Sequence, residues 1–168
     1  MAETMVRMGE LAASAVADDV LVSLGLGSCI GLALLDRRLG VAGLAHVVLP
    51  ASGGNRAAGA WKFADVAVPE LIARMLALGA RRHLLEAVLV GGASMFAVSK
   101  STLEVGTRNE AAVRELLARE RINVIACETG GARGRTIRVF VGTHEVTVRE
   151  AGGVEKKLVP GAPVGALS

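Results

Sequence analysis

Residues 21–36, LVSLGLGSCIGLALLD, join two apolar runs through a glycine-rich turn. Val, Ile and Leu favour extended chain and Gly marks turns, so the runs predict strands over 20–26 and 30–35. A turn of this kind suits one of two chemistries. It either holds a phosphate on its bare backbone, or it supports the thiol of Cys29. The spacing of the glycines and the element that follows decide between them.

The phosphate-binding interpretation fails on both counts. The dinucleotide fingerprint requires Gly-x-Gly-x-x-Gly at the start of a helix. Gly25 and Gly27 fit the first two positions, but Ile30 occupies the third, and a strand pattern follows it. Without a helix N-terminus there is no aligned set of N–H groups to face a phosphate. The sequence therefore argues against nucleotide binding at this turn.

Length and composition describe one domain with a large aliphatic core. The chain has 168 residues, of which 52% are hydrophobic and 2% aromatic. A chain of this length buries roughly 70% of its unfolded surface, so it needs neither a disulfide nor a metal to be stable. We expect a single domain over 1–168, with its core at about 5–150 and a partly loose C-terminal tail over 151–168.

The sequence carries no sign of export or membrane insertion. Its apolar runs are shorter than the roughly 18 residues that a spanning helix needs, and MAETMVRMGE at the start does not resemble a secretory signal. With two cysteines, we expect a cytoplasmic protein with reduced thiols. The net charge of +3 is scattered without interleaved aromatics. This argues against nucleic-acid binding and is compatible with an acidic protein partner.

Strand-like segments lead and close the chain, and helical segments lie between them. The further strands are predicted over 41–49, 84–90, 122–127, 136–141 and 145–149. Helices are predicted over 69–79 and 109–120, with an earlier helical piece over 61–68 that Pro69 kinks or ends. The first three strands follow one another too closely for helical crossovers, so we expect them to pair antiparallel. The predicted fold class is α+β, with a mixed or antiparallel sheet.

Cys29 is distinguished by the glycines around it. A cysteine taken alone is most simply a small buried apolar residue. Gly25, Gly27 and Gly31, however, leave room for a substrate to approach and leave backbone N–H groups free to stabilise an oxyanion. These surroundings predict a nucleophilic thiol. Such a thiol needs a base, because the thiolate is the reactive form.

His46 is the histidine best placed to act on Cys29. It lies in the strand that returns through the DRRLG hairpin (36–40), which carries it back toward the cysteine. A third residue is needed to orient the imidazole. The nearby candidates are Ser23, Asp19 and Asp36, and spacing alone does not choose among them.

The remaining histidines and the second cysteine receive structural roles. His83 follows two arginines and is expected on the surface, His144 is expected in a solvated hairpin turn, and Cys127 is expected to pack. A metal site built from Cys29, His46, Cys127 and His144 would lack the closely spaced ligand pairs that are typical of such sites. No metal is therefore predicted.

The chain resembles the CheD family of chemotaxis proteins over about residues 5–150. The matching segments, in the family's order, are SLGLGSCIGLALLD, GLAHVVLP, VGGASMF, VGTRNEAAVRELL and TGGARGR. The Leu-Gly-Ser-Cys block with a histidine seventeen residues after the cysteine is the most specific part. The resemblance implies a β-sandwich-like core flanked by helices, similar to the catalytic domains of deamidating toxins.

The resemblance also implies a role for each site residue. The family's nucleophile falls on Cys29 and its general base on His46. Its third residue, typically a threonine six positions before the cysteine, falls on Ser23, which keeps the hydroxyl but lacks the methyl that restricts χ1. Backbone N–H groups near Gly27 and Ser28 are expected to stabilise the oxyanion. No metal or organic cofactor is required.

The implied activity is a protein-glutamine deamidase that converts chemoreceptor glutamines to glutamate and ammonia through a thioester. Its implied partners are the cytoplasmic domain of a chemoreceptor and the phosphatase CheC, with no nucleic acid and no membrane insertion. The thiol of such an enzyme is expected to react unusually fast with iodoacetamide near neutral pH. The alternatives are a non-catalytic adaptor that binds the receptor or a CheC-like phosphatase, and an enzyme that transfers the acyl group to an amine.

Overall fold

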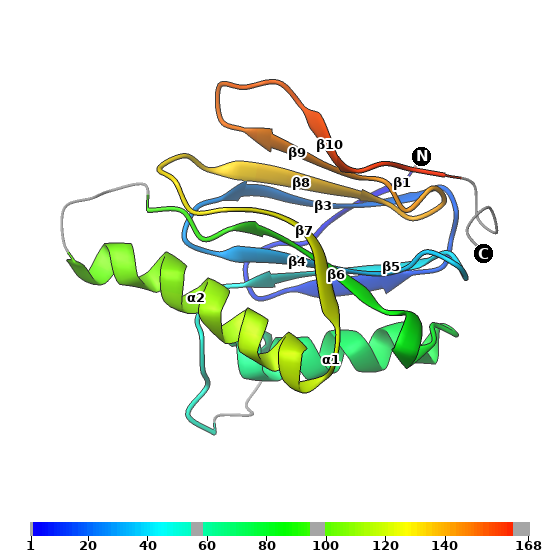
Figure 1. Ribbon diagram of the computed structural model, residues 1–168, viewed down its shortest axis with the longest axis horizontal. Coiled ribbons are helices and arrows are strands. Elements are labelled where there is room, and N and C mark those ends of the chain that lie inside the picture. Colours follow the sequence, from blue (N-terminus) through cyan, green and yellow to red (C-terminus); the bar gives the residue numbers. More distant parts are fainter. Residues whose placement is uncertain (1, 55–58, 95–99, 163–168) are drawn as a thin grey trace.

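Two five-stranded sheets packed face to face form the centre of the protein (Figure 1). This computed structural model describes residues 2–54, 59–94 and 100–162, without the side chains of 100–104. Sheet A contains, in spatial order, β1 (Ala2–Met5), β3 (Asp19–Leu26), β8 (Arg135–Phe140), β9 (Val146–Glu150) and β10 (Lys156–Val159). Sheet B contains, in spatial order, β2 (Leu11–Ser14), β5 (Val41–Val47), β4 (Ile30–Asp36), β6 (Glu86–Gly91) and β7 (Asn123–Thr129).

The two α-helices cover only the outer face of sheet B (Figure 1). They are α1 (Ala64–Ala77) and α2 (Lys100–Arg119), and short 3-10 turns lie at Ala60–Lys62 and Arg82–Leu84. The layers are therefore sheet A, sheet B and helices, with one apolar core between the sheets and a second under the helices. This arrangement confirms the predicted α+β class with a sandwich-like core flanked by helices. Among the described residues no helix is long and apolar enough to cross a membrane.

Strand β4 explains the uninterrupted apolar run in the sequence. It lies in the middle of sheet B, and all seven of its residues are buried. Leu32 and Leu34 belong to the core under the helices, whereas Ala33 and Leu35 belong to the core between the sheets. A strand that is covered on both faces has no polar face, so its sequence does not alternate between apolar and polar residues.

The turn before β4 crosses from one sheet to the other, which differs from the sequence prediction. Strands β4 and β5 pair antiparallel as expected. β3, however, pairs antiparallel with β8 and parallel with β1, not with β4. The end of β3 shifts register between Ser23 and Leu26, and Gly25 adopts a left-handed φ of 60°. The chain thereby leaves the plane of sheet A, and Cys29 lies at the crossing.

Other elements also differ from the predictions. Helix α1 starts at Ala64 and continues through Pro69, because a proline in the second turn removes only one backbone hydrogen bond. Helix α2 starts at Lys100, earlier than expected, and β1, β2 and β10 were not predicted. Strand β10 lies in the tail that was expected to be partly loose, and it pairs antiparallel with β9. Residues 163–168 of that tail lie outside the described residues.

His144 is buried, which corrects the expectation of a solvated turn. It lies between β8 and β9 with a left-handed φ of 50°, and its relative exposure is 1%. Both ring nitrogens lack a hydrogen-bond partner among the described residues. Burial lowers the pKa of His144, and the nearby positive charge of Arg37 lowers it further. The side chain is therefore a neutral core residue at neutral pH.

Gly91 lets β6 end directly against the loop of residues 27–29, which we call the Cys29 loop. Its φ is 117°, and a Cβ at this position would overlap the carbonyl oxygen of Cys29. The next residue, Gly92, donates its N–H to the same carbonyl at 2.9 Å. The missing side chain at position 91 therefore permits the close approach by which β6 holds the loop.

We predict that Gly91→Ala lowers the free energy of unfolding by about 2 kcal/mol or more, because backbone strain and overlap act together. Gly79→Ala is the matched control, since Gly79 has a φ of 100° but no heavy atom within 4 Å of the position its Cβ would take. Urea unfolding of both variants separates the two effects. An equal loss in both variants would show that contact with Cys29 contributes nothing.

Candidate active site at the crossing between the sheets

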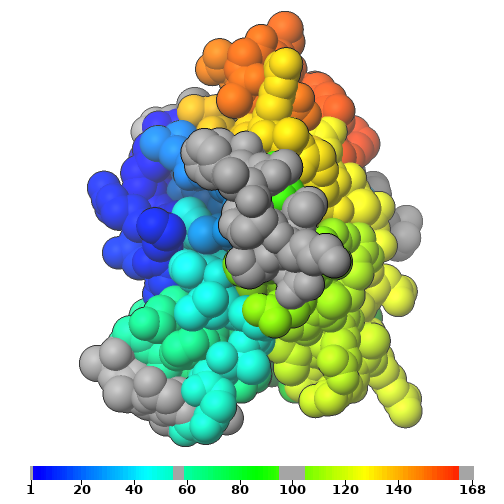
Figure 2. Space-filling model, turned by 90° about the vertical axis from the view of Figure 1, so that its left-hand side faces the viewer, coloured from blue at the N-terminus to red at the C-terminus, as the bar shows by residue number. Residues whose placement is uncertain are grey.

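The structure brings Cys29 and His46 to the same end of the sandwich. Cys29 directly precedes β4, and His46 lies near the end of β5, opposite Gly31. By this register Cys29, one residue before β4, lies diagonal to His46 across the β4–β5 pair. Figure 2 shows this end of the molecule, where the N-terminal residues and the residues that follow β5 come together.

All three carbonyl groups of the loop 27–29 accept hydrogen bonds from neighbouring elements. The donors are the N–H of Ala93 to Gly27 (2.8 Å), Nδ2 of Asn109 to Ser28 (2.9 Å) and the N–H of Gly92 to Cys29 (2.9 Å). The N–H groups of Gly27 and Ser28, by contrast, have no partner among the described residues. The loop is thus fixed through its acceptors, and two of its N–H groups are not used by any described residue.

Asn109 fastens the Cys29 loop to the segment that follows His46. It lies on α2, is fully buried, and donates from Nδ2 to the carbonyls of Ser28 and Val48, both at 2.9 Å. Two carbonyl acceptors require the NH₂ group of the amide, so its orientation is fixed. Its Oδ1 is buried without a partner among the described residues.

Sequence reasoning missed Asn109, although a signal was present. The residue lies four and seven positions before Val113 and Leu116, on the apolar face of the predicted helix. A polar residue on such a face must be hydrogen-bonded when it is buried, which marks it as a structural or functional contact.

The turn between β1 and β2 holds His46 in place. The N–H of His46 donates to the carbonyl of Glu10 at 3.0 Å, and its carbonyl accepts from the N–H of Gly9 at 3.0 Å. Its ring Nδ1 lies 3.1 Å from the carbonyl oxygen of Val6. A carbonyl can only accept, so Nδ1 carries the proton and Nε2 is the basic nitrogen of the neutral ring.

Ser23 does not bind His46 directly; the two side chains bind the same main-chain carbonyl. Its buried hydroxyl donates a hydrogen bond to the Val6 carbonyl oxygen at 2.8 Å. The same oxygen accepts the hydrogen bond from Nδ1 of His46. The group that orients His46 is therefore the Val6 carbonyl, and Ser23 holds that carbonyl. Of the other two candidates, Asp19 accepts from the hydroxyl of Ser14, and Asp36 accepts backbone N–H groups at the far end of β4.

Comparison with known proteins identifies the family. The family described as CheD chemotactic sensory transduction matches residues 48–150. A protein of Symbiobacterium thermophilum named probable chemoreceptor glutamine deamidase CheD is 42% identical over 91% of this chain and 95% of its own. The chain belongs to the CheD family.

A Methanococcus vannielii protein with the same name is 37% identical over 89% of this chain and 96% of its own. Among solved structures, the crystal structure of a Neisseria meningitidis protein matched by the DUF152 family has a TM-score of 0.48 and 13% identity. It covers 79% of this chain and 63% of that chain. Cys29 and His46 precede the segment that the CheD family description matches.

Burial shifts both titrating groups of this CheD site toward their neutral forms. It raises the pKa of the Cys29 thiol, an effect that a hydrogen bond with the residue's own backbone opposes. It also lowers the pKa of His46, against the opposing effects of the Val6 carbonyl and of Glu10. Both shifts favour neutral thiol and neutral imidazole over a thiolate–imidazolium pair. The expectation of an unusually reactive resting thiol is therefore not supported.

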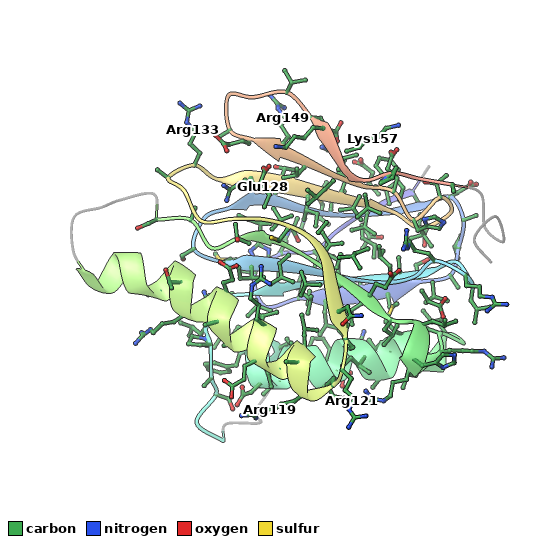
Figure 3. The ribbon with its side chains drawn as sticks, in the orientation of Figure 1. Arg119, Arg121, Glu128, Arg133, Arg149 and Lys157 are labelled. Carbon is green, nitrogen blue, oxygen red and sulfur yellow. The ribbon has the colours of Figure 1, made fainter. Side chains whose placement is uncertain are left out.

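Arg135 supports the same end of the CheD fold. It is 6% exposed, and its Nη1 donates to the carbonyls of Gly130 (2.8 Å) and Gly91 (3.3 Å). It also forms ion pairs with Glu128 (3.4 Å) and, at longer range, Glu150 (3.9 Å). Figure 3 shows Glu128 near the start of β8, below Arg133 and Arg149.

The remaining candidates do not join the site. Cys127 is exposed on β7, which corrects the expectation that it packs, and it lies beside Arg114. His144 lies in the β8–β9 turn, near Arg37 and Glu86 at the opposite end of β4 from Cys29. No group of three or more His, Cys, Asp or Glu residues suited to a metal ion exists in the described part of the chain.

We predict that iodoacetamide modifies Cys127 before Cys29 at pH 7.5. Cys29 is 9% exposed and its pKa is raised, so its thiolate is scarce until the pH exceeds the usual range of a thiol. Peptide mass mapping of wild type, and pH-dependent alkylation of Cys127→Ser, test this. A rate for Cys29 that is already at its plateau below pH 7 would instead indicate a resting thiolate.

We predict that Asn109→Ala lowers the free energy of unfolding by about 2–4 kcal/mol, because two buried carbonyls lose their donor. It should also speed alkylation of Cys29, since the loop is released on one side. Asn123→Ala, at an exposed position of β7, is the control and should change neither quantity. Unchanged alkylation in Asn109→Ala would mean that the amide does not position the loop.

Proposed function

We propose that this protein is a protein-glutamine deamidase that acts on chemoreceptors, with Cys29 as nucleophile and His46 as general base. Membership of the CheD family and the names of its relatives support the substrate class. The single observation that carries the chemistry is the orientation of His46. The Val6 carbonyl accepts a hydrogen bond from Nδ1–H, so Nε2 is left as the basic nitrogen at the end of the sandwich where Cys29 lies.

In the proposed reaction, His46 Nε2 takes the proton of Cys29 as the sulfur attacks Cδ of the glutamine side chain. The unused N–H groups of Gly27 and Ser28 stabilise the oxyanion. The imidazolium then returns its proton to the departing nitrogen, which leaves as ammonia, and a thioester remains on Cys29. Water, deprotonated by His46, hydrolyses the thioester to glutamate and restores the thiol.

The neutral resting state suits this sequence of proton transfers. His46 with a lowered pKa is a neutral acceptor before attack, and once protonated it is a stronger acid toward the leaving nitrogen. Cys29 with a raised pKa gives up its proton only when a substrate carbonyl is in place. The arrangement therefore ties formation of the thiolate to the presence of substrate.

The surface beside His46 suits a polypeptide substrate. A cavity of about 250 Å³ adjoins it, lined by Met5, Val6, Arg7, Met8, Val22, Leu24 and His46. Met8 and Leu24 are 66% and 55% exposed. Exposed apolar side chains around a reactive group match the surface of a protein better than free glutamine. The phosphatase CheC as a second partner and a cytoplasmic location belong to the same proposal and rest on the resemblance alone.

Intact-mass analysis of a chemoreceptor cytoplasmic domain tests the proposal. Treatment with wild-type protein should change the receptor mass by the amount expected for Gln-to-Glu conversion, and treatment with Cys29→Ala should leave the mass unchanged. His46→Ala should convert the receptor about 100-fold or more slowly than wild type. Cys127→Ala is the matched control and should retain activity. Ser23→Thr should also retain activity, because its hydroxyl can hold the Val6 carbonyl, whereas Ser23→Ala should slow the reaction.

Full activity in Cys29→Ala would exclude the proposed nucleophile. Receptor binding without any mass change in wild type would favour the non-catalytic adaptor. Incorporation of an added primary amine in place of hydrolysis would favour acyl transfer to amines, because both reactions share the thioester.

A further inference from the structure

Three arginines that have no acidic partner among the described residues lie at the end of the sandwich opposite Cys29. In the described part of the chain, five arginines have guanidinium groups with no acidic partner and no hydrogen-bond acceptor, and they are Arg7, Arg38, Arg81, Arg108 and Arg121. Three of the five, Arg38, Arg81 and Arg121, line two adjoining cavities. Figure 3 shows Arg121 just beyond the end of α2, pointing away from the protein.

The two cavities adjoin and share part of their lining. The larger, about 460 Å³, is lined by Arg37, Arg38, His83, Leu84, Leu85, Glu86, Arg121 and Asn123. The smaller, about 350 Å³, is lined by Arg38, Leu39, Arg81, His83 and Leu84. Arg38, His83 and Leu84 are common to both. Volumes of this order are typical of sites for small molecules.

A buried carboxylate fixes the backbone from which two of the arginines extend. Asp36 is fully buried, and its Oδ1 accepts from the N–H groups of Arg38 (3.1 Å) and Leu39 (3.0 Å). Its Oδ2 accepts from the N–H of Arg81 at 2.9 Å. Asp36 therefore joins the β4–β5 turn to the segment after α1 and sets the spacing of Arg38 and Arg81.

Two glutamates beside the cavities already have arginine partners. Glu86 receives two hydrogen bonds from Arg37, at 2.6 and 3.0 Å. Glu120 pairs with Arg82 at 2.5 Å. Arg38, Arg81 and Arg121 therefore form no ion pair with the described residues, and Asp36 beneath them is buried and accepts hydrogen bonds from backbone N–H groups.

We propose that this surface, which we call the arginine site, binds a small ligand with two or more linked phosphate groups. Guanidinium groups bind phosphate oxygens in pairs, and arginine is favoured over lysine for such contacts. Arg38 and Arg121 line the larger cavity, and Arg38 and Arg81 line the smaller one. Linked phosphate groups suit this arrangement, because they can contact arginines of two adjoining cavities at once. The proposal does not depend on the deamidase activity, because the arginine site lies at the other end of β4.

Calorimetric titration of the whole protein with pyrophosphate and with ATP tests the arginine site. We expect saturable binding that weakens as salt is added. Arg38→Gln combined with Arg121→Gln should weaken the affinity about tenfold or more, as loss of charged hydrogen bonds predicts. Arg7→Gln combined with Arg108→Gln removes the same charge elsewhere and should leave affinity unchanged. Tighter binding of ATP indicates a nucleotide, and equal binding indicates a phosphate chain alone.

Absence of saturable binding by both probes would overturn the proposal. Equal weakening in the two double variants would also overturn it, because binding would then follow net charge only. Binding of a polyglutamate peptide without binding of either phosphate would replace it with an acidic protein partner. The thermal unfolding midpoint of each variant verifies folding, and Arg81→Gln alone provides a second variant with less loss of charge.

Discussion

The three hydrogen bonds to the carbonyls of residues 27–29 are the constraint on which the candidate active site depends. A chain that crosses between two packed sheets leaves its backbone groups without a strand partner, and buried groups of this kind must be satisfied elsewhere. Here α2 and the end of β6 supply the donors, from Asn109, Gly92 and Ala93. Because every acceptor is used, the remaining polarity of the loop is that of its N–H groups. The same bonds that permit the crossing therefore create a donor-rich loop beside a thiol.

The second half of the site rests on one carbonyl group. Val6 accepts from both Ser23 and His46, and it is itself fixed by its N–H bond to Val22 at 2.7 Å. In this arrangement a serine is sufficient at position 23. Holding a main-chain oxygen requires only the hydroxyl, and burial restricts the side chain in place of the missing methyl. The turn between β1 and β2 therefore contributes to the orientation of His46 as much as β5 does.

The sequence was sufficient to predict the parts of the site that are close along the chain. The β4–β5 hairpin could be recognised from its turn, and with it the proximity of Cys29 and His46. The crossing between sheets could not, because tight spacing of strands indicates pairing unless distant strands such as β8 compete for it. Asn109 and Val6 are far from Cys29 in sequence, so only tertiary packing reveals their roles. His144 was misplaced because turn composition predicts exposure, whereas the neighbouring strands bury it.

The two ends of β4 differ in charge, with a neutral thiol and imidazole near one end and exposed arginines near the other, and distance keeps them apart. Seven strand residues span about 20 Å, whereas salt at physiological strength screens charge over about 8 Å. An anion bound by exposed Arg38 and Arg121 would therefore have little direct effect on the protonation of Cys29 or His46. Any influence of the arginine site on the candidate active site must pass through the chain itself. β4 is fully buried and paired with β5 and β6, so displacing it would require both neighbouring strands and the packing on its two faces to move as well. Independent operation of the two ends is what the physical arrangement favours.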